Sequence, residues 1–280
     1  MLHTIENEAL RCEIDALGAQ LHALHCKTNG KDYLWRGDPA IWYGQAPILF
    51  PIIGQLIDNC FRYRGARYTM PKHGLARKLP FALDSISETQ AVFRLDSNAE
   101  TRKSYPFDFS LYAAFSLDGA ALTNRLTVVN RTDGPLFFSL GAHPAFNCAL
   151  GDRLVFEQAE TVSAEKIDKE NLLRPERFPV LDNARELTLT KDLFSEDALI
   201  LSGLRSKSVE LTGDYALRFT FGDCPFLGLW AKPGAPYVCI EPWFGINDDH
   251  TPRADFSEKR GIQRIEKGET FSYAWTAEIL

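Results

Sequence analysis

The chain has 280 residues, 45% of them hydrophobic, and a formal net charge of -6. This length and composition allow a large hydrophobic core, and the modest, interspersed charge argues against nucleic-acid binding and against a basic membrane-binding face. No stretch is long and apolar enough to cross a bilayer, and the N-terminus lacks the basic and apolar segments of an export signal. We therefore expect one domain, residues 1–280, in a cytoplasmic monomer or homodimer that binds neither nucleic acid nor membrane.

The first part of the chain reads as β-strands joined by turns. Apolar and charged residues alternate over residues 10–15, and residues 20–26 alternate again, as in half-buried strands. Residues 38–43 begin with an aspartate and a proline, which predicts a short helix. Residues 46–57 are too apolar for a surface loop and too interrupted by proline and glycine for a helix, so we expect buried, irregular backbone. Residues 61–69 predict a hairpin that turns at a glycine.

The second part continues this pattern. Strands and turns alternate from residue 91 to 147, and another pair of strands is expected at residues 208–221. Residues 152–190 are more polar and less regular, and residues 171–179 are expected to form a surface loop. Regularly spaced strands without long helices between them predict an all-β sandwich or barrel rather than an α/β fold.

The cysteines are scattered, with no CxxC motif and no clustered spacing. Without an export signal they are expected to be free thiols, mostly buried. His22 and His25 are three residues apart, but in a strand this spacing places them on opposite faces, and no third ligand lies nearby. We therefore predict no metal site. The six cysteines are Cys12, Cys26, Cys60, Cys148, Cys224 and Cys239.

One histidine stands where a strand is expected to end. Residues 136–140 form an apolar run, and His143 follows shortly after it, directly before Pro144. The proline removes a backbone donor and biases His143 away from helical backbone, so the imidazole should stand at the strand end. An imidazole held by a rigid sheet can donate or accept a proton near neutral pH. Taken alone, a structural histidine is the plainer interpretation.

A second titratable residue precedes a proline in the same way. The apolar run at residues 237–240 is followed by Glu241 and then by a proline. A carboxylate at the end of an apolar strand is costly to bury alone, so it is either ion-paired or has a raised pKa and serves as a base. With His73 and Asp197, the pair of His143 and Glu241 would supply the acid and the base that proton transfer on a sugar requires.

Four segments in a fixed order resemble one known family. Together they are similar to the aldose 1-epimerase, or galactose mutarotase-like, superfamily, and within it to the LacX-like branch, and the resemblance runs from end to end. It implies a large antiparallel β-sandwich with few short helices, a sugar bound in a cleft on one sheet, and a reaction without cofactor or metal. The four segments are HGLAR (73–77), GAHPAFN (141–147), EDALI (196–200) and CIEPWFG (239–245).

The resemblance also implies a role for each matching residue. His143 matches the general acid that protonates the ring oxygen of the sugar. Glu241 matches the general base that takes the proton from the anomeric hydroxyl. His73 matches the histidine that helps to hold the ring oxygen or a neighbouring hydroxyl, and Asp197 matches the acidic residue that hydrogen-bonds ring hydroxyls.

One position departs from the family pattern. Many relatives carry a substrate-contacting arginine where this chain has Gln55, whose amide can hydrogen-bond a hydroxyl but carries no charge. Arg77 is then the candidate for the missing cation. Trp230, Trp243 and Phe244 could pack against a sugar face, but such residues are more often part of the core, so we leave them out of the predicted site.

These residues predict an isomerase, an aldose 1-epimerase of hexose metabolism that acts on a free aldohexose. One alternative is a hexose-6-phosphate 1-epimerase, because the guanidinium of Arg77 suits a phosphate. Another is a protein of the same fold that binds a sugar without turnover. A glycosidase needs two carboxylates at a defined separation, and only Glu241 lies in a convincing motif.

Overall fold

The computed structural model describes residues 1–280. Strands hold 52% of the residues and helices 5%, which confirms the predicted all-β class. None of the helical segments is long and apolar enough to cross a membrane. The helical segments are one α-helix, α1 (Ala99–Ser104), and three 3₁₀ turns, Ile57–Asn59, Ala76–Lys78 and Phe256–Glu258.

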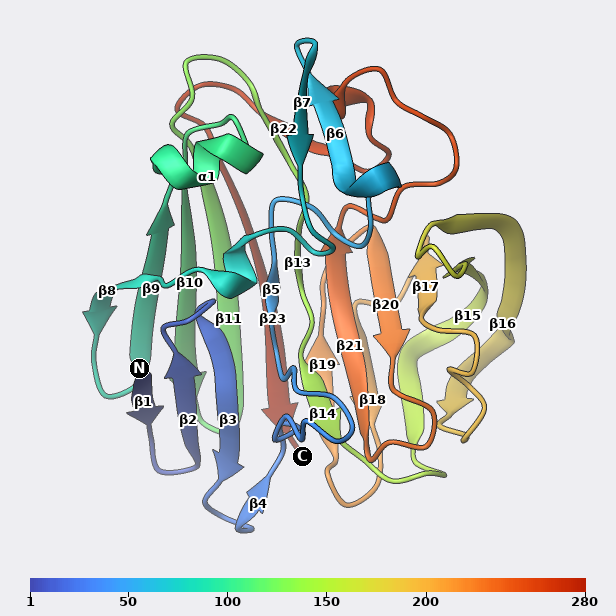
Figure 1. The fold of residues 1–280 in the computed structure, drawn as a ribbon. Coiled ribbons are helices and arrows are strands. Elements are labelled where there is room, and N and C mark those ends of the chain that lie inside the picture. The colour runs from blue at the N-terminus through green and yellow to red at the C-terminus, as the bar shows by residue number, and fades with distance from the viewer.

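A sheet of 15 strands runs through the whole molecule (Figure 1). Two of its strands lie off the main order: β14 (Ala145–Asn147) pairs with β21, and β16 (Leu173–Thr188) pairs with β15. From edge to edge the order is β5 (Ile48–Leu49), β13 (Leu140–Ala142), β21 (Tyr237–Phe244), β20 (Phe226–Trp230), β17 (Leu199–Ser202), β15 (Arg153–Ile167), β18 (Ser208–Leu211), β19 (Leu217–Thr220), β23 (Thr270–Ile279), β11 (Ala121–Asn130), β10 (Phe109–Asp118), β9 (Gln90–Asp96) and β8 (Ala82–Ile86).

Three smaller sheets complete the fold. A four-stranded sheet covers the β9–β11 part of the large sheet (Figure 1), where the rings of His3 and Phe93 meet edge to face with centroids 5.4 Å apart. Apolar side chains buried between the layers form a continuous core. The strands of these sheets are β1 (Leu2–Glu6), β2 (Leu10–Asp15), β3 (Gln20–Cys26) and β4 (Lys31–Asp32), then β6 (Cys60–Tyr63) with β7 (Ala66–Thr69), and β12 (Leu136–Phe138) with β22 (Gln263–Ile265).

Most of the predicted elements are present. The strands and turns between residues 91 and 147 and at 208–221 are confirmed, as is the hairpin at 61–69, which is β6 and β7. Residues 46–57 are largely buried and nearly devoid of regular structure, as expected from their prolines and glycines. The period-two alternation of apolar residues is therefore a reliable guide where one face of a strand is covered.

The predicted helix at residues 38–43 is wrong. Asp38 does cap a turn, since its carboxylate accepts a hydrogen bond from the Ala40 N–H at 2.9 Å. The chain makes only this one turn and then leaves it, because the ring of Trp42 stacks on Tyr237 of the large sheet with centroids 5.5 Å apart. Burial of this aromatic face outweighs the few hydrogen bonds that further helical residues would add.

The expectation for residues 152–190 is also wrong. This stretch forms the two longest strands, β15 and β16, and the loop expected at 171–179 lies largely within β16. Four register shifts interrupt the ladder between these strands, so the side chains do not alternate regularly. Pro175 and Pro179 fit because β16 pairs only with β15 and has a free edge.

Candidate active site

The register of two neighbouring strands places His143 opposite Glu241. Gly141 of β13 pairs with Trp243 of β21, and Ala145 of β14 pairs with Cys239, so His143 and Glu241 face each other in the gap between β13 and β14. The strand does end before His143, as predicted. The strand that carries Glu241 does not end there, because β21 continues through Pro242 to Phe244, which corrects that expectation. Pro242 lies at the same gap. β21 has no paired residue there on the side of β13 and β14, so the missing N–H of the proline breaks no hydrogen bond of that ladder.

The two side chains form a buried acid–base pair. His143 Nε2 lies 3.4 Å from a carboxylate oxygen of Glu241, and the residues are 9% and 1% exposed. His143 Nδ1 and Glu241 Oε2 have no hydrogen-bond partner. Native proteins rarely leave buried polar atoms unpaired. These two atoms therefore retain hydrogen-bonding capacity, and Oε2 is the oxygen that faces His143 Nε2.

A cavity of about 300 Å³ opens over this pair. It lies within the size range of small-molecule sites. Segments far apart in the sequence contribute to its wall, so the site exists only in the folded chain. Besides His143 and Glu241, the lining includes Trp42, Lys72, His73, Arg77, Asp197, Trp230, Lys232, Trp243 and Asn247.

His73 is held as a neutral donor. Its ring Nδ1 accepts a hydrogen bond from the Gly54 N–H at 3.2 Å, so the ring proton resides on Nε2. Burial, followed by the charge of His143, lowers the pKa of His73 well below its usual value. The backbone of His73 is left-handed (φ 64°), and the next residue must be glycine, because a Cβ at Gly74 would lie 2.2 Å from the Phe50 carbonyl oxygen. Left-handed backbone at a residue other than glycine is a strain that proteins tend to keep at functional sites.

Three cations surround the cavity. Lys72 Nζ donates to Asn171 Oδ1 at 2.6 Å, and Arg77 Nη2 donates to the Lys72 carbonyl at 2.9 Å. Burial lowers the pKa of Lys72, an effect that the nearby carboxylates of Asp197 and Glu241 oppose. Arg77 Nε is buried without a partner, and Lys232 adds the third positive charge. The wall is thus suited to ligands rich in oxygen.

Burial sets the protonation of the central pair. It raises the pKa of Glu241 well above its usual value and lowers the pKa of His143 to about 3. Both shifts favour the uncharged forms, because the low-dielectric interior disfavours isolated charges. Burial therefore favours a carboxylic acid beside a neutral imidazole, with one transferable proton on the pair.

Aromatic rings enclose the imidazole. Trp42 stacks on the His143 ring, with centroids 5.0 Å apart and planes 26° apart, and Trp230 meets it edge-on at 5.9 Å. His73 approaches from another side at 5.8 Å. The ring of His143 is therefore fixed in orientation from three directions.

The whole chain matches a known family. A family model described as aldose 1-epimerase matches residues 1–274. The chain belongs to the aldose 1-epimerase family. It is 36% identical over 295 residues to the plasmid-encoded protein LacX of Lactococcus lactis subsp. lactis, covering 99% of this chain and 98% of that protein, in agreement with the LacX-like branch.

Solved structures agree with this membership. The galactose mutarotase related enzyme from Lactobacillus acidophilus superposes with a TM-score of 0.94 at 30% identity, covering 100% of this chain and 97% of that one. A galactose mutarotase-like protein from Lactobacillus casei superposes with a TM-score of 0.95 at 28% identity, covering all of both chains. The galactose mutarotase-like fold expected from the sequence is therefore confirmed.

In this family member, five of the six predicted site residues line one cavity: His143, Glu241, His73, Asp197 and Arg77. Asp197 has left-handed backbone (φ 71°), as His73 does. The sixth residue does not line the cavity.

Gln55 turns away from the cavity. Its amide donates to Asn59 Oδ1 at 2.5 Å and to the Leu56 carbonyl at 3.2 Å. The turn at Gly54 (φ 68°) directs the following side chain outward, and the Asn247 side chain occupies the space beside Gly54. Asn247 lines the cavity instead, and we remove Gln55 from the proposed site.

Sequence reasoning missed several lining residues. Lys72 precedes His73 directly, so the HGLAR segment gave a signal for it. Trp230 and Trp243, which the sequence favours as core residues, both line the cavity, whereas Phe244 packs against Phe271 and Tyr273. Trp42, Lys232 and Asn247 carry no local signal, because only the tertiary fold brings them to the cavity.

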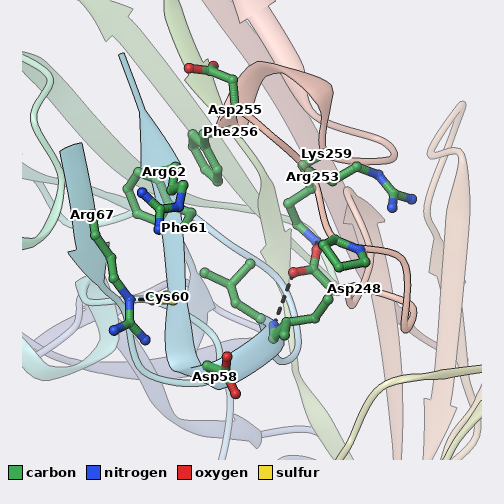
Figure 2. Close-up of a pocket in the computed structure, with 13 residues that line it drawn as sticks. Asp58, Cys60, Phe61, Arg62, Arg67, Asp248, Arg253, Asp255, Phe256 and Lys259 are labelled. Carbon is green, nitrogen blue, oxygen red and sulfur yellow. Dashed lines mark hydrogen bonds and ion pairs between the residues drawn. The ribbon is translucent and has the colours of Figure 1, made fainter. Parts of the chain in front are cut away.

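A second cavity lies between the β6–β7 hairpin and the loop after β21 (Figure 2). Its volume is about 360 Å³. Lys259 Nζ donates to Asp248 Oδ1 at 2.6 Å, and the other oxygen of Asp248 accepts the Ile57 N–H at 3.1 Å. Asp255 accepts the backbone N–H groups of Arg64 and Ser257. Hydrogen bonds therefore tie the two walls of this cavity together.

Proposed function

We propose that this protein is an aldose 1-epimerase that interconverts the α and β anomers of a free aldohexose, with residues 1–280 acting as one catalytic unit. The observation that carries the proposal is the His143–Glu241 pair, 3.4 Å apart at the base of a cavity of suitable volume. Family membership supports the reaction class. A cytoplasmic location and a monomeric or homodimeric state remain predictions.

The proposed reaction needs one acid and one base. Glu241 accepts the proton of the anomeric hydroxyl while His143 donates a proton to the ring oxygen, and the bond between C1 and the ring oxygen breaks to give the open-chain aldehyde. Rotation about C1–C2 presents the other face of the carbonyl. Reclosure reverses both transfers, so no atom or electron is gained or lost. Each positioned proton transfer contributes about 10²–10⁴-fold to the rate.

The protonation that burial favours differs from the one these roles need. The roles need a carboxylate and an imidazolium, whereas burial favours a carboxylic acid and a neutral imidazole. Both arrangements hold one proton, so they interconvert by a transfer between the two side chains. Hydroxyl groups of a bound sugar, together with Lys72, would stabilise the carboxylate and shift the proton to His143.

His73, Asp197 and Asn247 are proposed to bind the sugar. His73 would offer its Nε2–H to the ring oxygen or to a neighbouring hydroxyl. Asp197, exposed at the mouth, would accept hydrogen bonds from ring hydroxyls, and the Asn247 amide can both donate and accept. None of these roles needs a charge on the substrate.

A second candidate substrate is a hexose 6-phosphate. Lys72, Arg77 and Lys232 give the cavity three cations, against the two carboxylates of Asp197 and Glu241. The unpaired Nε of Arg77 offers a donor in a geometry that suits phosphate oxygens. These three cations are the evidence for a phosphorylated substrate. The absence of Gln55 from the cavity is not.

Proton NMR of the anomeric signals tests both candidates. Freshly dissolved α-D-glucose, α-D-galactose and α-D-glucose 6-phosphate are followed with and without protein, beside the Glu241→Gln variant. Faster exchange of the free sugars that is lost in the variant supports the first proposal. Acceleration of the phosphate alone replaces it with the second, and Arg77→Met should then lose that activity. Sugar binding without acceleration would indicate a non-catalytic binding protein.

A further inference from the structure

A buried thiol lies beside the proposed acid–base pair. Cys239 is two residues before Glu241 on β21, so both side chains point to the same face of the sheet, and its register partner Ala145 follows His143 by two residues. Cys239 is a free cysteine and is fully buried. The sequence did not predict this grouping, because His143 comes from a distant part of the chain.

The three side chains bring three different donor atoms together. A ring nitrogen of His143, the sulfur of Cys239 and a carboxylate oxygen of Glu241 all lie within 4.8 Å of one another. Imidazole, thiolate and carboxylate are the protein ligands of zinc, whose bonds of about 2.0–2.3 Å place tetrahedral ligands roughly 3.5 Å apart. The 3.4 Å between His143 and Glu241 already has this spacing. The sulfur lies within 4.8 Å of both atoms, and rotation of the Cys239 side chain would bring it to bonding distance.

We propose that His143, Cys239 and Glu241 form a binding site for Zn²⁺ or Cd²⁺, and that the bound cation inhibits the enzyme. Three protein ligands leave a fourth tetrahedral position open toward the cavity, where a water molecule completes the set. The cation occupies the nitrogen and the oxygen that the proposed reaction uses for proton transfer. The binding is independent of the proposed function, whereas the inhibition rests on it.

Charge balance supports this assignment. Binding releases the thiol proton and the carboxyl proton to solvent, and the resulting thiolate and carboxylate neutralise the two charges of the cation. Lys72 and Arg77 face the same cavity and would repel an uncompensated cation, so a set with two anionic ligands is required. Mg²⁺ and Ca²⁺ prefer six or more oxygen ligands and should neither bind nor inhibit.

The decisive experiment compares Cys239→Ala with Cys60→Ala. Cys239→Ala removes the sulfur and leaves the acid–base pair intact, and Cys60→Ala removes a more exposed thiol at the second cavity as a matched control. Anomer exchange is measured against increasing Zn²⁺ and Cd²⁺. Loss of a residue that only hydrogen-bonds a metal ligand weakens metal binding roughly 10–100-fold. Loss of a ligand should cost more, so in Cys239→Ala the metal concentration that halves the exchange rate should rise by more than about 100-fold. In Cys60→Ala it should match the unmodified protein.

Direct binding separates this inference from the proposed function. The ultraviolet charge-transfer band of a cadmium–thiolate bond is titrated in the unmodified protein and in both variants, whether or not any sugar is turned over. A band that is absent only in Cys239→Ala supports the site. Equal inhibition of Cys239→Ala and the unmodified protein, or a band that persists in Cys239→Ala, overturns it. Cys239→Ser serves as a second variant if the alanine variant fails to fold.

Discussion

Two cavities of this molecule, one over His143 and Glu241 and one beside the β6–β7 hairpin, differ in the state of their buried polar atoms. The cavity beside the β6–β7 hairpin is the larger of the two, at about 360 Å³ against about 300 Å³, yet its buried Lys259 is paired with Asp248. The cavity over His143 and Glu241 leaves polar atoms buried and unpaired. Unsatisfied hydrogen-bonding capacity, rather than volume, therefore marks the site that awaits a ligand. The unpaired atoms are His143 Nδ1, Glu241 Oε2, Arg77 Nε and Trp243 Nε1.

The largest effect is expected from His143 and Glu241, the proposed acid and base. Glu241→Gln and His143→Ala should each lower kcat by about 10²–10⁴-fold, because each removes one positioned proton transfer. Anomer exchange at saturating sugar measures the loss, and circular dichroism checks that the fold is retained. Near-normal exchange in either variant would contradict the proposed mechanism.

The second cavity should respond in stability and not in turnover. Lys259→Met leaves the Asp248 carboxylate buried without its partner, which should lower the free energy of unfolding by about 3 kcal/mol. At a temperature where the variant is folded, kcat should stay within about twofold of the unmodified protein, a change below 0.5 kcal/mol. Urea unfolding and anomer exchange on the same sample provide both values. A large loss of kcat with unchanged stability would reverse the contrast between the cavities.

A smaller effect is expected from the ring that stacks on His143. Trp42→Leu removes the aromatic face, and aromatic contacts of this kind contribute about 0.5–1.5 kcal/mol beyond their buried area, so kcat should fall by up to about 10-fold. Trp42→Phe retains a face and should lose less. Because an aromatic face also stabilises an imidazolium, the pKa of His143, followed by NMR, should be lower in Trp42→Leu than in Trp42→Phe. Equal pKa values in the two variants would limit Trp42 to a packing role.

The last prediction concerns the pH dependence of stability. The pKa of Glu241 is raised in the folded state, so above about pH 4.5 the folded protein retains a proton that the unfolded chain has lost. The contribution of Glu241 to the free energy of unfolding should therefore fall as pH rises from there toward the raised pKa, by up to about 1.4 kcal/mol per pH unit. Below about pH 6.5 the lowered pKa of His143 opposes this fall, because the unfolded chain then carries a proton that the folded imidazole lacks. Glu241→Gln lacks this term, so its stability relative to the unmodified protein should increase with pH. Parallel curves from chemical unfolding would argue against the raised pKa.

The sequence was sufficient for the fold class and for the expectation that His143 and Glu241 lie together. Strands with one covered face carry the period-two signal, and His143 and Glu241 were recognised by the prolines that follow them. α1 was missed although Asn98 and Thr101 cap it reciprocally, a local signal that could have been used. β15 and β16 gave no regular alternation, because the ladder between them is repeatedly shifted.

The orientation of site residues depended on tertiary contacts. Gln55 was assigned to the site from its position in the family pattern, and only the turn at Gly54 directs it outward. Asn171 holds Lys72 in the cavity wall from a turn between two strands that the sequence reading treated as irregular. Contacts of this kind join segments about a hundred residues apart, so no local pattern could have indicated them.

The gap between β13 and β14 has a consequence for how this site can change during evolution. The distance between acid and base is set by strand register, and a slip of one residue would turn a whole strand face away from the cavity. The spacing of the pair can therefore change only in coarse steps, each of which disrupts the sheet. The turns that carry Lys72, Asp197 and Lys232 have no such constraint. New substrates are thus expected to arise by changes in these turns, while the chemical step remains the same.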